Sequence, residues 1–262
     1  MGETDPNLSA TALKALAVLD VLGARGCPLT VSEVAEEVGA DRATAYRMLT
    51  TLVQAGYARR DQSDRRYQLG FKLLSLARHL VSEDERATQI LATLRRISEE
   101  TGETVHYSVL DGDTAVLVFR AKGTQRVAVD FQIGDRSPLH CTSIGKVLLA
   151  FGTAEAAEAV IAAGLPPLGP RTITDPEAFR RELAIVREQG YAYDDLEFAS
   201  DMRCLAVPIF ESGGGVPGGI AISGPSSRFN FARLDELCAM AVHHAEELSR
   251  LLGGAMATHG HS

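Results

Sequence analysis

A run of arginines between residues 42 and 78 is the strongest chemical signal in the chain. This segment holds eight Lys/Arg residues against two acids, Asp61 and Asp64, although the whole chain of 262 residues has a net charge of -8. Guanidinium groups bind phosphates and can donate two hydrogen bonds to one guanine. A basic segment in an acidic chain therefore predicts a nucleic-acid-binding surface confined to one part of the molecule.

Two amphipathic helices and the turn between them would position these arginines. Residues 31–38 repeat apolar side chains at the helical spacing, Gly39 can adopt the positive φ of a tight turn, and Asp41 occupies the N-cap position of a second helix. The second helix turns its apolar residues inward and its other residues outward. The outward residues are Arg42, Ala43, Thr44, Tyr46, Arg47 and Thr50. In a helix-turn-helix protein such a face reads base edges in the major groove of DNA.

A basic hairpin follows the second helix. Residues 57–61 and 65–69 predict two short strands, and the polar turn 62–64 joins them. The hairpin carries four arginines, which suit phosphates or the minor groove. They are Arg59, Arg60, Arg65 and Arg66. Together with Ser32, near the start of the first helix, these residues complete the predicted DNA-binding set of a winged helix-turn-helix.

The remaining pattern divides the chain into four parts. Residues 9–69 form the predicted winged helix-turn-helix domain, residues 70–84 a linker helix, residues 85–252 a second domain, and residues 253–262 a disordered tail. The linker helix is expected to break near residues 82–84 and is a candidate to pair with its copy in a second subunit. An N-terminal helix, capped by Ser9 or Thr11 and extending to about Ala24, is expected to complete the first core. Its predicted inward residues are Leu13, Leu16, Ala17, Leu19 and Leu22.

The second domain changes from the helical period to the period of strands. Strands are predicted at residues 104–110, 115–120, 127–131, 191–194, 204–210 and 218–223. Helices are predicted to begin near Ser143 and to cover residues 154–163, 176–189 and 231–252. This order favours an α+β sheet domain able to enclose a small ligand. The free N–H groups at the start of the helix near Ser143 would bind a ligand carboxylate.

The cysteine pattern and the hydropathy argue against several classes of protein. The four cysteines contain no C-x-x-C pair, which disfavours a zinc ribbon or a disulfide framework and suits a reducing cytoplasm. The N-terminus lacks the apolar segment of a signal peptide, and no run approaches 18 apolar residues. Neither secretion nor membrane spanning is therefore expected, and no cofactor or metal is predicted.

An enzyme is the competing interpretation. His106, His140, Cys141, Cys204 and Asp194 could supply a Cys/His nucleophile or a metal site, so a small-molecule hydrolase or a metalloenzyme stays open. No spacing among them enforces a shared geometry. The pattern favours a DNA-binding protein, because the turn, the helix spacing and the basic hairpin occur together.

Several longer motifs, in their order and spacing, carry a resemblance to a known family. They are ATAYRMLTTLVQAGY, RRYQLG, PLHCTSIGKVLLA, TITDP, GYAYDDLEF, RCLAVPIF and AISGP. Over residues 9–252 the chain resembles the IclR family of bacterial transcriptional regulators. The resemblance implies a winged helix, a linker helix and a C-terminal GAF-like domain, with an antiparallel sheet flanked by helices, that binds a small metabolite. It also implies a homodimer, or a tetramer built as a dimer of dimers, that binds a palindromic operator in double-stranded DNA, here most simply as a repressor.

The resemblance also implies an effector site in the second domain. The corresponding residues are Val129, Ser143, Ile144, Gly145, Asp194, Cys204, Ala221 and Ser223. Two departures from the carboxylate-binding members remove polarity or space, since Ala221 stands where they have serine and the loop holds bulky Ile144. We therefore expect an acid larger or more apolar than glyoxylate or pyruvate, for instance an aromatic acid. Asp194 would accept a hydrogen bond from a ligand hydroxyl, orient a backbone amide or cap a turn, and Cys204 would be a small buried apolar residue.

Overall fold

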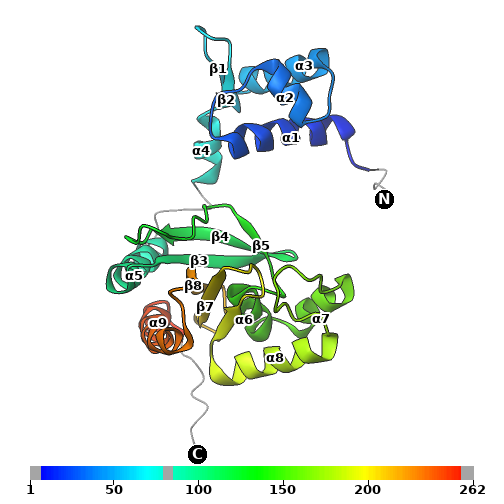
Figure 1. Ribbon diagram of the computed structural model, residues 1–262. Coiled ribbons are helices and arrows are strands. Elements are labelled where there is room, and N and C mark those ends of the chain that lie inside the picture. Colours follow the sequence, from blue (N-terminus) through cyan, green and yellow to red (C-terminus); the bar gives the residue numbers. More distant parts are fainter. Residues whose placement is uncertain (1–6, 79–84, 255–262) are drawn as a thin grey trace, which may run out of the picture. The chain divides into compact units, whose positions relative to one another are not determined.

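The chain folds into two compact units, residues 1–82 and residues 83–262 (Figure 1). The computed structural model describes residues 7–78 and 85–254. The first unit contains α1 (Ala10–Arg25), α2 (Val31–Glu37), α3 (Arg42–Gln54), β1 (Ala58–Arg60), β2 (Tyr67–Leu69) and α4 (Lys72–Ala77). These are the three helices and the hairpin of a winged helix-turn-helix, followed by the linker helix. The predicted break of the linker helix at residues 82–84 falls outside the described residues.

Side-chain caps define the helix-turn-helix. The Thr30 hydroxyl accepts a hydrogen bond from the backbone N–H of Glu33, and the Glu33 carboxylate accepts one from the N–H of Thr30, so α2 begins with a capping box. Gly39 has a φ of 61°, which is the left-handed conformation expected of the turn. Asp41 then caps α3 by accepting from the N–H of Thr44 at 2.9 Å. The predicted helices, turn and cap are confirmed.

The predicted inward face of α1 is wrong in part. The first core buries Val18 and Leu22, whereas Leu13 and Leu16 are 46% and 56% exposed. Val18 and Leu22 are four residues apart and share a face of α1, whereas Leu13 lies nine residues before Leu22, about half a turn around the helix from it. The residues of α1 that join this core lie between positions 18 and 22. The N-terminal half of α1 therefore presents apolar side chains to solvent.

The hairpin strands are shorter than predicted. Only three pairs join them, from Ala58 opposite Leu69 to Arg60 opposite Tyr67. Asp61 accepts hydrogen bonds from the N–H and the hydroxyl of Ser63, and Asp64 accepts one from the N–H of Arg66. These side-chain turns compete with ladder pairing and widen the hairpin tip. Arg65 lies in that tip with a φ of 60° and is not part of a strand.

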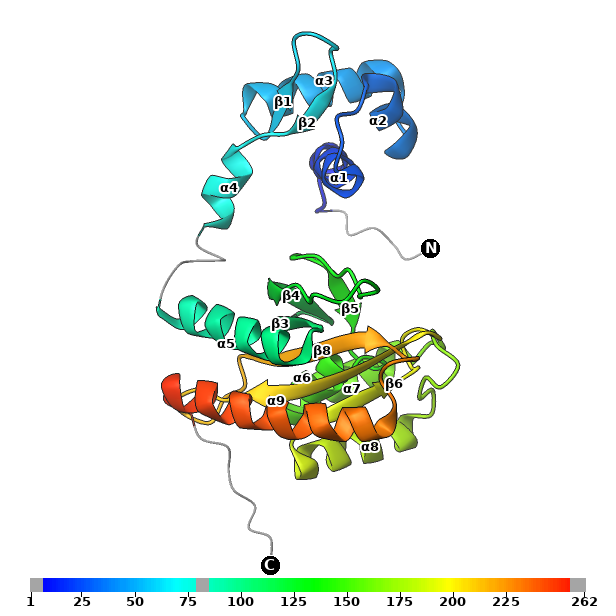
Figure 2. The same ribbon diagram turned by 60° about the vertical axis from the view of Figure 1, so that its left-hand side comes forward.

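The second unit is built on one six-stranded antiparallel sheet. Its elements are α5 (Glu85–Thr101), β3 (Thr104–Asp111), β4 (Thr114–Ala121), β5 (Arg136–Pro138), α6 (Ser143–Phe151), α7 (Ala154–Ala163), α8 (Pro176–Gln189), β6 (Ala192–Asp195), β7 (Met202–Ile209), β8 (Gly218–Pro225) and α9 (Phe231–Leu251). The strand order is β5-β4-β3-β8-β7-β6. Figures 1 and 2 show α5 and α9 next to each other on one side of the sheet and α6, α7 and α8 on the other. This is the expected α+β architecture.

The two faces of the sheet carry side chains of different size. In β8 the large residues Ile220 and Ile222 alternate with Gly219, Ala221 and Ser223. The small residues face α6, because Ala221 belongs to the same core cluster as residues of α6, and a side chain at Gly219 would meet Ile144. Successive strand residues point to opposite faces, so the isoleucines face the α5 and α9 side. The face below α6, called the α6 face from here on, carries the short polar side chains.

Two predictions for this unit are corrected. Residues 127–131 are not a strand, because the Arg228 guanidinium donates to the carbonyl of Val127 at 3.0 Å and the Arg120 guanidinium donates to the carbonyl of Phe131. These side chains use carbonyls that a strand ladder would need. β5 pairs with β4 instead. Gly253, predicted as the first residue of the disordered tail, pairs with Glu211 in a β-bridge, and residues 255–262 lie outside the described residues.

Candidate DNA-binding surface and ligand site

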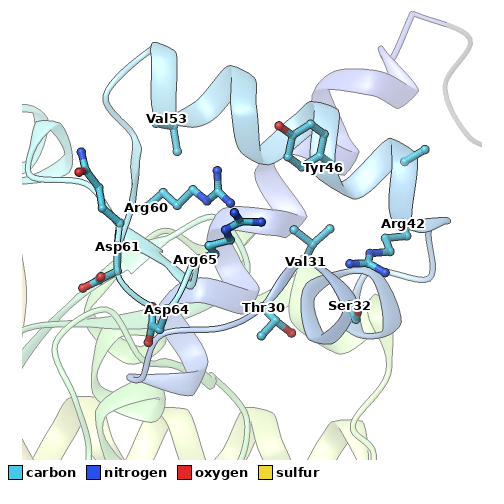
Figure 3. A pocket seen from close by; sticks show the side chains of 12 residues that line it. Thr30, Val31, Ser32, Arg42, Tyr46, Val53, Arg60, Asp61, Asp64 and Arg65 are labelled. Atoms are coloured by element: carbon cyan, nitrogen blue, oxygen red, sulfur yellow. The ribbon is translucent and has the colours of Figure 1, made fainter.

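A concave groove lies between α3 and the hairpin of the first unit (Figure 3). Its volume is ≈ 1140 Å³. Six residues of the predicted DNA-binding set line it, namely Ser32, Arg42, Ala43, Tyr46, Arg60 and Arg65. In Figure 3 the side chains of Arg60 and Arg65 extend from the hairpin into the space beside α3, and Arg42 extends from the start of α3. Sequence-distant arginines therefore converge on one surface, called the DNA groove from here on.

The start of α3 adds to the positive potential of the DNA groove. Arg42 is the first residue of α3, where the free N–H groups and the helix dipole carry partial positive charge. The neighbouring carboxylate of Asp41 is held by Thr44, whose N–H and hydroxyl donate to it at 2.9 and 2.7 Å. The same hydrogen bonds hold the pKa of Asp41 below its usual range. The carboxylate of Asp41 therefore caps α3, and both of its oxygens accept hydrogen bonds from Thr44.

Three further predicted residues lie on α3 outside the lining of the DNA groove. Arg47 is exposed, and its guanidinium donates to the Thr44 hydroxyl at 3.3 Å. The Thr50 hydroxyl donates to the carbonyl of Tyr46 at 2.8 Å. The Thr44 hydroxyl is therefore already hydrogen-bonded. The long, exposed side chain of Arg47 on the same helix can reach a ligand.

The remaining two arginines of the hairpin contact their own domain. The guanidinium of Arg59 lies 4.6 Å from the centre of the Phe71 ring, on the strand face opposite to Arg60. Arg66 donates to the carbonyl of Pro28 at 3.0 Å and to the Glu33 carboxylate at 3.3 Å. Arg66 thus connects the base of the hairpin to the start of α2, and its guanidinium does not line the DNA groove.

The second unit places the predicted effector residues in a cross-strand row. Asp194 of β6 lies opposite Cys204 of β7, Cys204 lies opposite Ser223 of β8, and Ser223 lies opposite Thr104 of β3. These four residues, called the polar row, share the α6 face with Ala221. All four are buried. The pairing of four strands therefore gathers side chains that are up to 119 positions apart along the chain.

Buried polar atoms without a partner concentrate around this row. Among the described residues, five buried side-chain atoms lack a hydrogen bond. They are His106 Nδ1, Arg120 Nε, Asp194 Oδ2, Glu197 Oε2 and Ser223 Oγ. Each such atom costs about 1–3 kcal/mol when water is removed from it, so folded proteins rarely leave several together. The cluster is typical of a site that completes its hydrogen bonds with a polar ligand.

Burial keeps the ionisable groups of the site close to neutrality. It raises the pKa of Asp194 to about 7, although the N–H groups of Glu197 and Phe198 donate to its Oδ1. Burial also raises the pKa of the Cys204 thiol, which argues against a nucleophilic thiolate. It lowers the pKa of His106 to about 4, with a further contribution from the charge of Arg120. Asp194 caps the turn after β6, as one of its predicted roles required.

The start of α6 forms the wall above the polar row. Thr142 caps the helix by accepting from the N–H of Gly145 at 3.2 Å. The N–H groups of Ser143 and Ile144 lie in the first turn of α6, where a backbone N–H has no partner within the helix. A side chain at Gly145 would meet the carbonyl of Leu139 at 2.3 Å, so this glycine permits close packing of the preceding loop. Val129 is half-buried in the loop between β4 and β5.

A buried ion network also lies behind the site. The Lys146 ammonium is 1% exposed and lies 2.7 Å from both the Glu182 and the Glu197 carboxylates. Burial would lower the pKa of Lys146, but the charges of these two acids outweigh it and raise the pKa. The sequence patterns predict no role for Lys146. A buried ion pair could have been predicted from the sequence, because a lysine inside an otherwise apolar helix requires acidic partners.

The structure therefore brings most of the predicted effector residues together and adds two that were missed. His106 and Arg120 lie opposite each other on the α6 face, beside Ala221. The sequence predicts His106 only as a candidate enzyme residue and predicts no role for Arg120. Neither assignment was possible without the pairing register, since alternation alone does not show which face of a strand is covered.

Comparisons with known proteins agree with this architecture in both units. Residues 11–62 match the model of the IclR helix-turn-helix domain, and residues 79–250 match that of the bacterial transcriptional regulator IclR C-terminal domain. The chain belongs to the IclR family. The HTH-type transcriptional regulator KdgR of Escherichia coli is 32% identical over 252 residues, covering 96% of this chain and 95% of KdgR.

Two further relatives of this IclR-family protein extend the comparison. The transcriptional repressor IclR of E. coli is 29% identical over 244 residues, covering 92% of this chain and 89% of the repressor. The crystal structure of an IclR homologue from Microbacterium hydrocarbonoxydans, complexed with 4-hydroxybenzoate, superimposes with a TM-score of 0.76 at 25% identity. It covers 92% of this chain and 100% of the homologue.

The IclR assignment decides between the two classes of function that the sequence left open. The relatives are transcriptional regulators, so the hydrolase and metalloenzyme interpretation is withdrawn and the chain is not an enzyme. In the described part of the chain, no group of three or more His, Cys, Asp or Glu residues is arranged to hold a metal ion. Nor does any described helix have the length and apolar character needed to cross a membrane.

Proposed function

We propose that the chain is a cytoplasmic repressor that binds a palindromic operator as a homodimer, or as a dimer of dimers, and that a small organic or aromatic acid bound on the α6 face changes its operator affinity. The DNA groove is the observation that carries the first part. It combines Arg42 at a helix N-terminus with Arg60 and Arg65 from the hairpin. Such a surface suits a polyanion that presents base edges next to phosphates. The relative named as a repressor supports the sign of regulation.

Exposed apolar side chains in the first unit support the dimer. Leu13 and Leu16 of α1 are exposed, as are Leu74 and Leu76 of α4. Phe71, just before α4, is 68% exposed. Large apolar residues on short helices favour burial against another protein surface. A second copy of the same chain satisfies this requirement and also supplies the second DNA groove that a palindrome needs.

The polar row and the start of α6 support an acidic effector. Free N–H groups at a helix start bind carboxylates, and Ser223 Oγ and Asp194 Oδ2 are without partners below them. Ala221 and Ile144 make the rest of the surface apolar. This combination suits an acid with an apolar body, and the homologue that binds 4-hydroxybenzoate is consistent with an aromatic acid.

Operator binding with and without acid tests the proposal. Fluorescence anisotropy with DNA from the protein's own promoter region should detect specific binding, and Arg42→Ala should weaken it by about 5- to 150-fold if this arginine reads a base. Gel filtration with light scattering should report a dimer or a tetramer, and Leu74→Glu should shift it to the monomer.

The effector part is tested on the same DNA. Addition of 4-hydroxybenzoate, benzoate, 4-hydroxybutanoate or butanoate should lower operator affinity, and Asp194→Ala should abolish that response while leaving binding in the absence of acid intact. Wild-type operator affinity in the Arg42→Ala variant would remove the base contact from the proposal. An unchanged response to acid in the Asp194→Ala variant would remove the effector site.

A further inference from the structure

His106 occupies the end of the ligand site opposite to Asp194. It lies directly across from Ala221 on one side and from Arg120 on the other, which places it on the α6 face. His106 is 5% exposed, and its ring lies edge-on to the ring of Phe131 with 5.5 Å between their centres. His106 and Asp194 stand on strands that are three strand spacings apart, or about 14 Å. The site therefore has a polar group at each end, and Ala221 and Ser223 lie on the strand between them.

The ring of His106 differs from the other buried histidines in the described part of the chain. His140 is equally buried, but its Nε2–H donates to the carbonyl of Pro166 at 2.9 Å. His244 lies within hydrogen-bond distance of Arg96 and Glu100. His106 Nδ1 is buried without any partner. A folded chain satisfies its buried histidines elsewhere, so the exception at the ligand site points to a missing ligand group.

The surroundings of His106 select the chemistry of that group. Burial keeps the pKa of the ring at about 4, so the imidazole is neutral near pH 7. A neutral imidazole nitrogen carries either a proton or a lone pair, according to tautomer. A hydroxyl can accept from the first or donate to the second, whereas a carboxylate can serve only the first. The guanidinium of Arg120 is already paired with Asp130 at 2.7 Å, and its unpartnered Nε–H can donate to a hydroxyl oxygen as well as to a carboxylate.

We infer that His106 binds a hydroxyl group of the effector, and that the effector is a hydroxy acid with its carboxylate at the start of α6 and its hydroxyl at the far end. His106 is then the residue that separates hydroxylated acids from their deoxy counterparts. This inference rests on the proposed function, because it extends the same ligand site by one specificity-determining contact.

Matched pairs of acids test the contact directly. Calorimetric titration of the full chain with 4-hydroxybenzoate and benzoate, and with 4-hydroxybutanoate and butanoate, should show about 10- to 100-fold tighter binding of the hydroxylated member of at least one pair. In His106→Phe the preference should fall below about twofold, because the hydroxyl loses its partner while the carboxylate keeps its own. His106→Gln, whose amide both donates and accepts, should keep part of it.

Thermal unfolding without ligand gives a test that does not depend on the choice of acid. Replacing an unpartnered buried ring by an apolar one should raise the melting temperature, by about 2–10 °C, in His106→Phe or in the smaller His106→Leu. The matched control His140→Phe breaks an existing hydrogen bond and should lower it. If both His106 variants melt below wild type, Nδ1 is satisfied in the free protein and the inference fails.

The remaining outcomes separate this inference from the proposed function. Equal binding of both members of every pair, with binding still lost in Asp194→Ala, would overturn the role of His106 and leave the acid site standing. Failure of all four acids to bind the wild-type protein would overturn the hydroxy-acid class. Unchanged operator binding in Arg42→Ala would instead contradict the DNA-binding proposal, whatever His106 does.

Discussion

The DNA groove and the ligand site use polar side chains in opposite ways. The groove is open, and its arginines are exposed and permanently charged. The residues of the proposed ligand site are buried, and burial brings Asp194 and His106 toward their neutral forms. Long-range charge attracts a polyanion of any sequence, whereas buried neutral groups discriminate by hydrogen bonds that a wrong ligand leaves unmade. We therefore expect DNA affinity in the first unit to come mainly from charge, and ligand selectivity in the second from buried hydrogen bonds.

Salt should separate the two regions by the largest factor. In the proposed dimer the DNA groove supplies six arginines, and release of the counterions they replace should lower operator affinity by about 10³-fold between 50 and 200 mM salt. Binding of 4-hydroxybenzoate should change by less than about threefold, because burial shields that contact from screening. Anisotropy and calorimetry over the same salt series measure both. Equal salt slopes for operator binding and for 4-hydroxybenzoate binding would contradict this difference between the two units.

The pH dependence of stability should distinguish Asp194 from His106, the two displaced ionisable groups of the proposed ligand site. The folded-state pKa of Asp194 is about 7, above its ordinary value of 3.8, so the folded protein binds the extra proton and this group stabilises it as the pH falls from 7 to 4. The folded-state pKa of His106 is about 4, below 6.5, so this group destabilises the folded protein as the pH falls through the same range. The two contributions oppose each other between pH 4 and 6.5.

Single substitutions should separate the two opposing contributions to the pH dependence of the free energy of unfolding. Asp194→Asn leaves the histidine contribution alone, so its stability relative to wild type should fall on acidification by up to about 1.4 kcal/mol per pH unit. His106→Phe should show the opposite trend. Urea unfolding between pH 4.5 and 7 measures the free energy of unfolding of each protein. Parallel curves for the two variants would mean that neither pKa is displaced.

Substitution of two neighbouring arginines should distinguish a direct contact with DNA from a structural role in the first unit. Arg65→Ala removes a guanidinium from the DNA groove, so affinity should fall on all sequences and the salt slope should shrink by about 2 in a dimer. Arg66→Ala removes the contact to Pro28 and Glu33, so affinity should fall while the slope stays unchanged. Anisotropy with specific and random DNA distinguishes the two. A reduced slope in Arg66→Ala would show that Arg66 contacts phosphate instead.

Loss of the α6 cap should produce the smallest effect. Thr142→Ala removes the acceptor of the Gly145 N–H and should cost about 1 kcal/mol of stability, measured by urea unfolding. The cap also fixes the helix end at which the acid is proposed to bind, so affinity for 4-hydroxybenzoate should fall slightly. Thr30→Ala, which removes the cap of α2, is the matched control. It should leave that affinity unchanged, and a change would contradict the assignment of the acid to α6.

Features with local determinants could be predicted from the sequence. The cap Asp41, the left-handed Gly39 and the start of α6 at Ser143 each depend on a few neighbouring residues, and the structure confirms all three. Prediction failed where a distant residue decides. Residues 127–131 alternate like a strand, but side chains of Arg120 and Arg228 take two of their carbonyls.

The candidate sites follow the same division. Arginines of the DNA groove could be predicted, because helix and hairpin patterns fix their positions within one short segment. Leu13 and Leu16 were predicted to face the core, but they lie on a different side of α1 from Val18 and Leu22, which do. His106 could not be assigned to the ligand site, since its neighbours Ala221 and Arg120 are supplied by strand pairing.

The pairing of β7 with β8 has a consequence for insertions and deletions. Eight residue pairs join these strands, from Met202 opposite Pro225 to Ile209 opposite Gly218. Insertion of one residue near the start of β8 would shift its register and present Ile222 to α6 in place of Ser223. The site would then exchange its hydroxyl for a hydrocarbon without any change of composition nearby. The proposed ligand site is therefore sensitive to a shift in strand register as well as to substitution of its own residues.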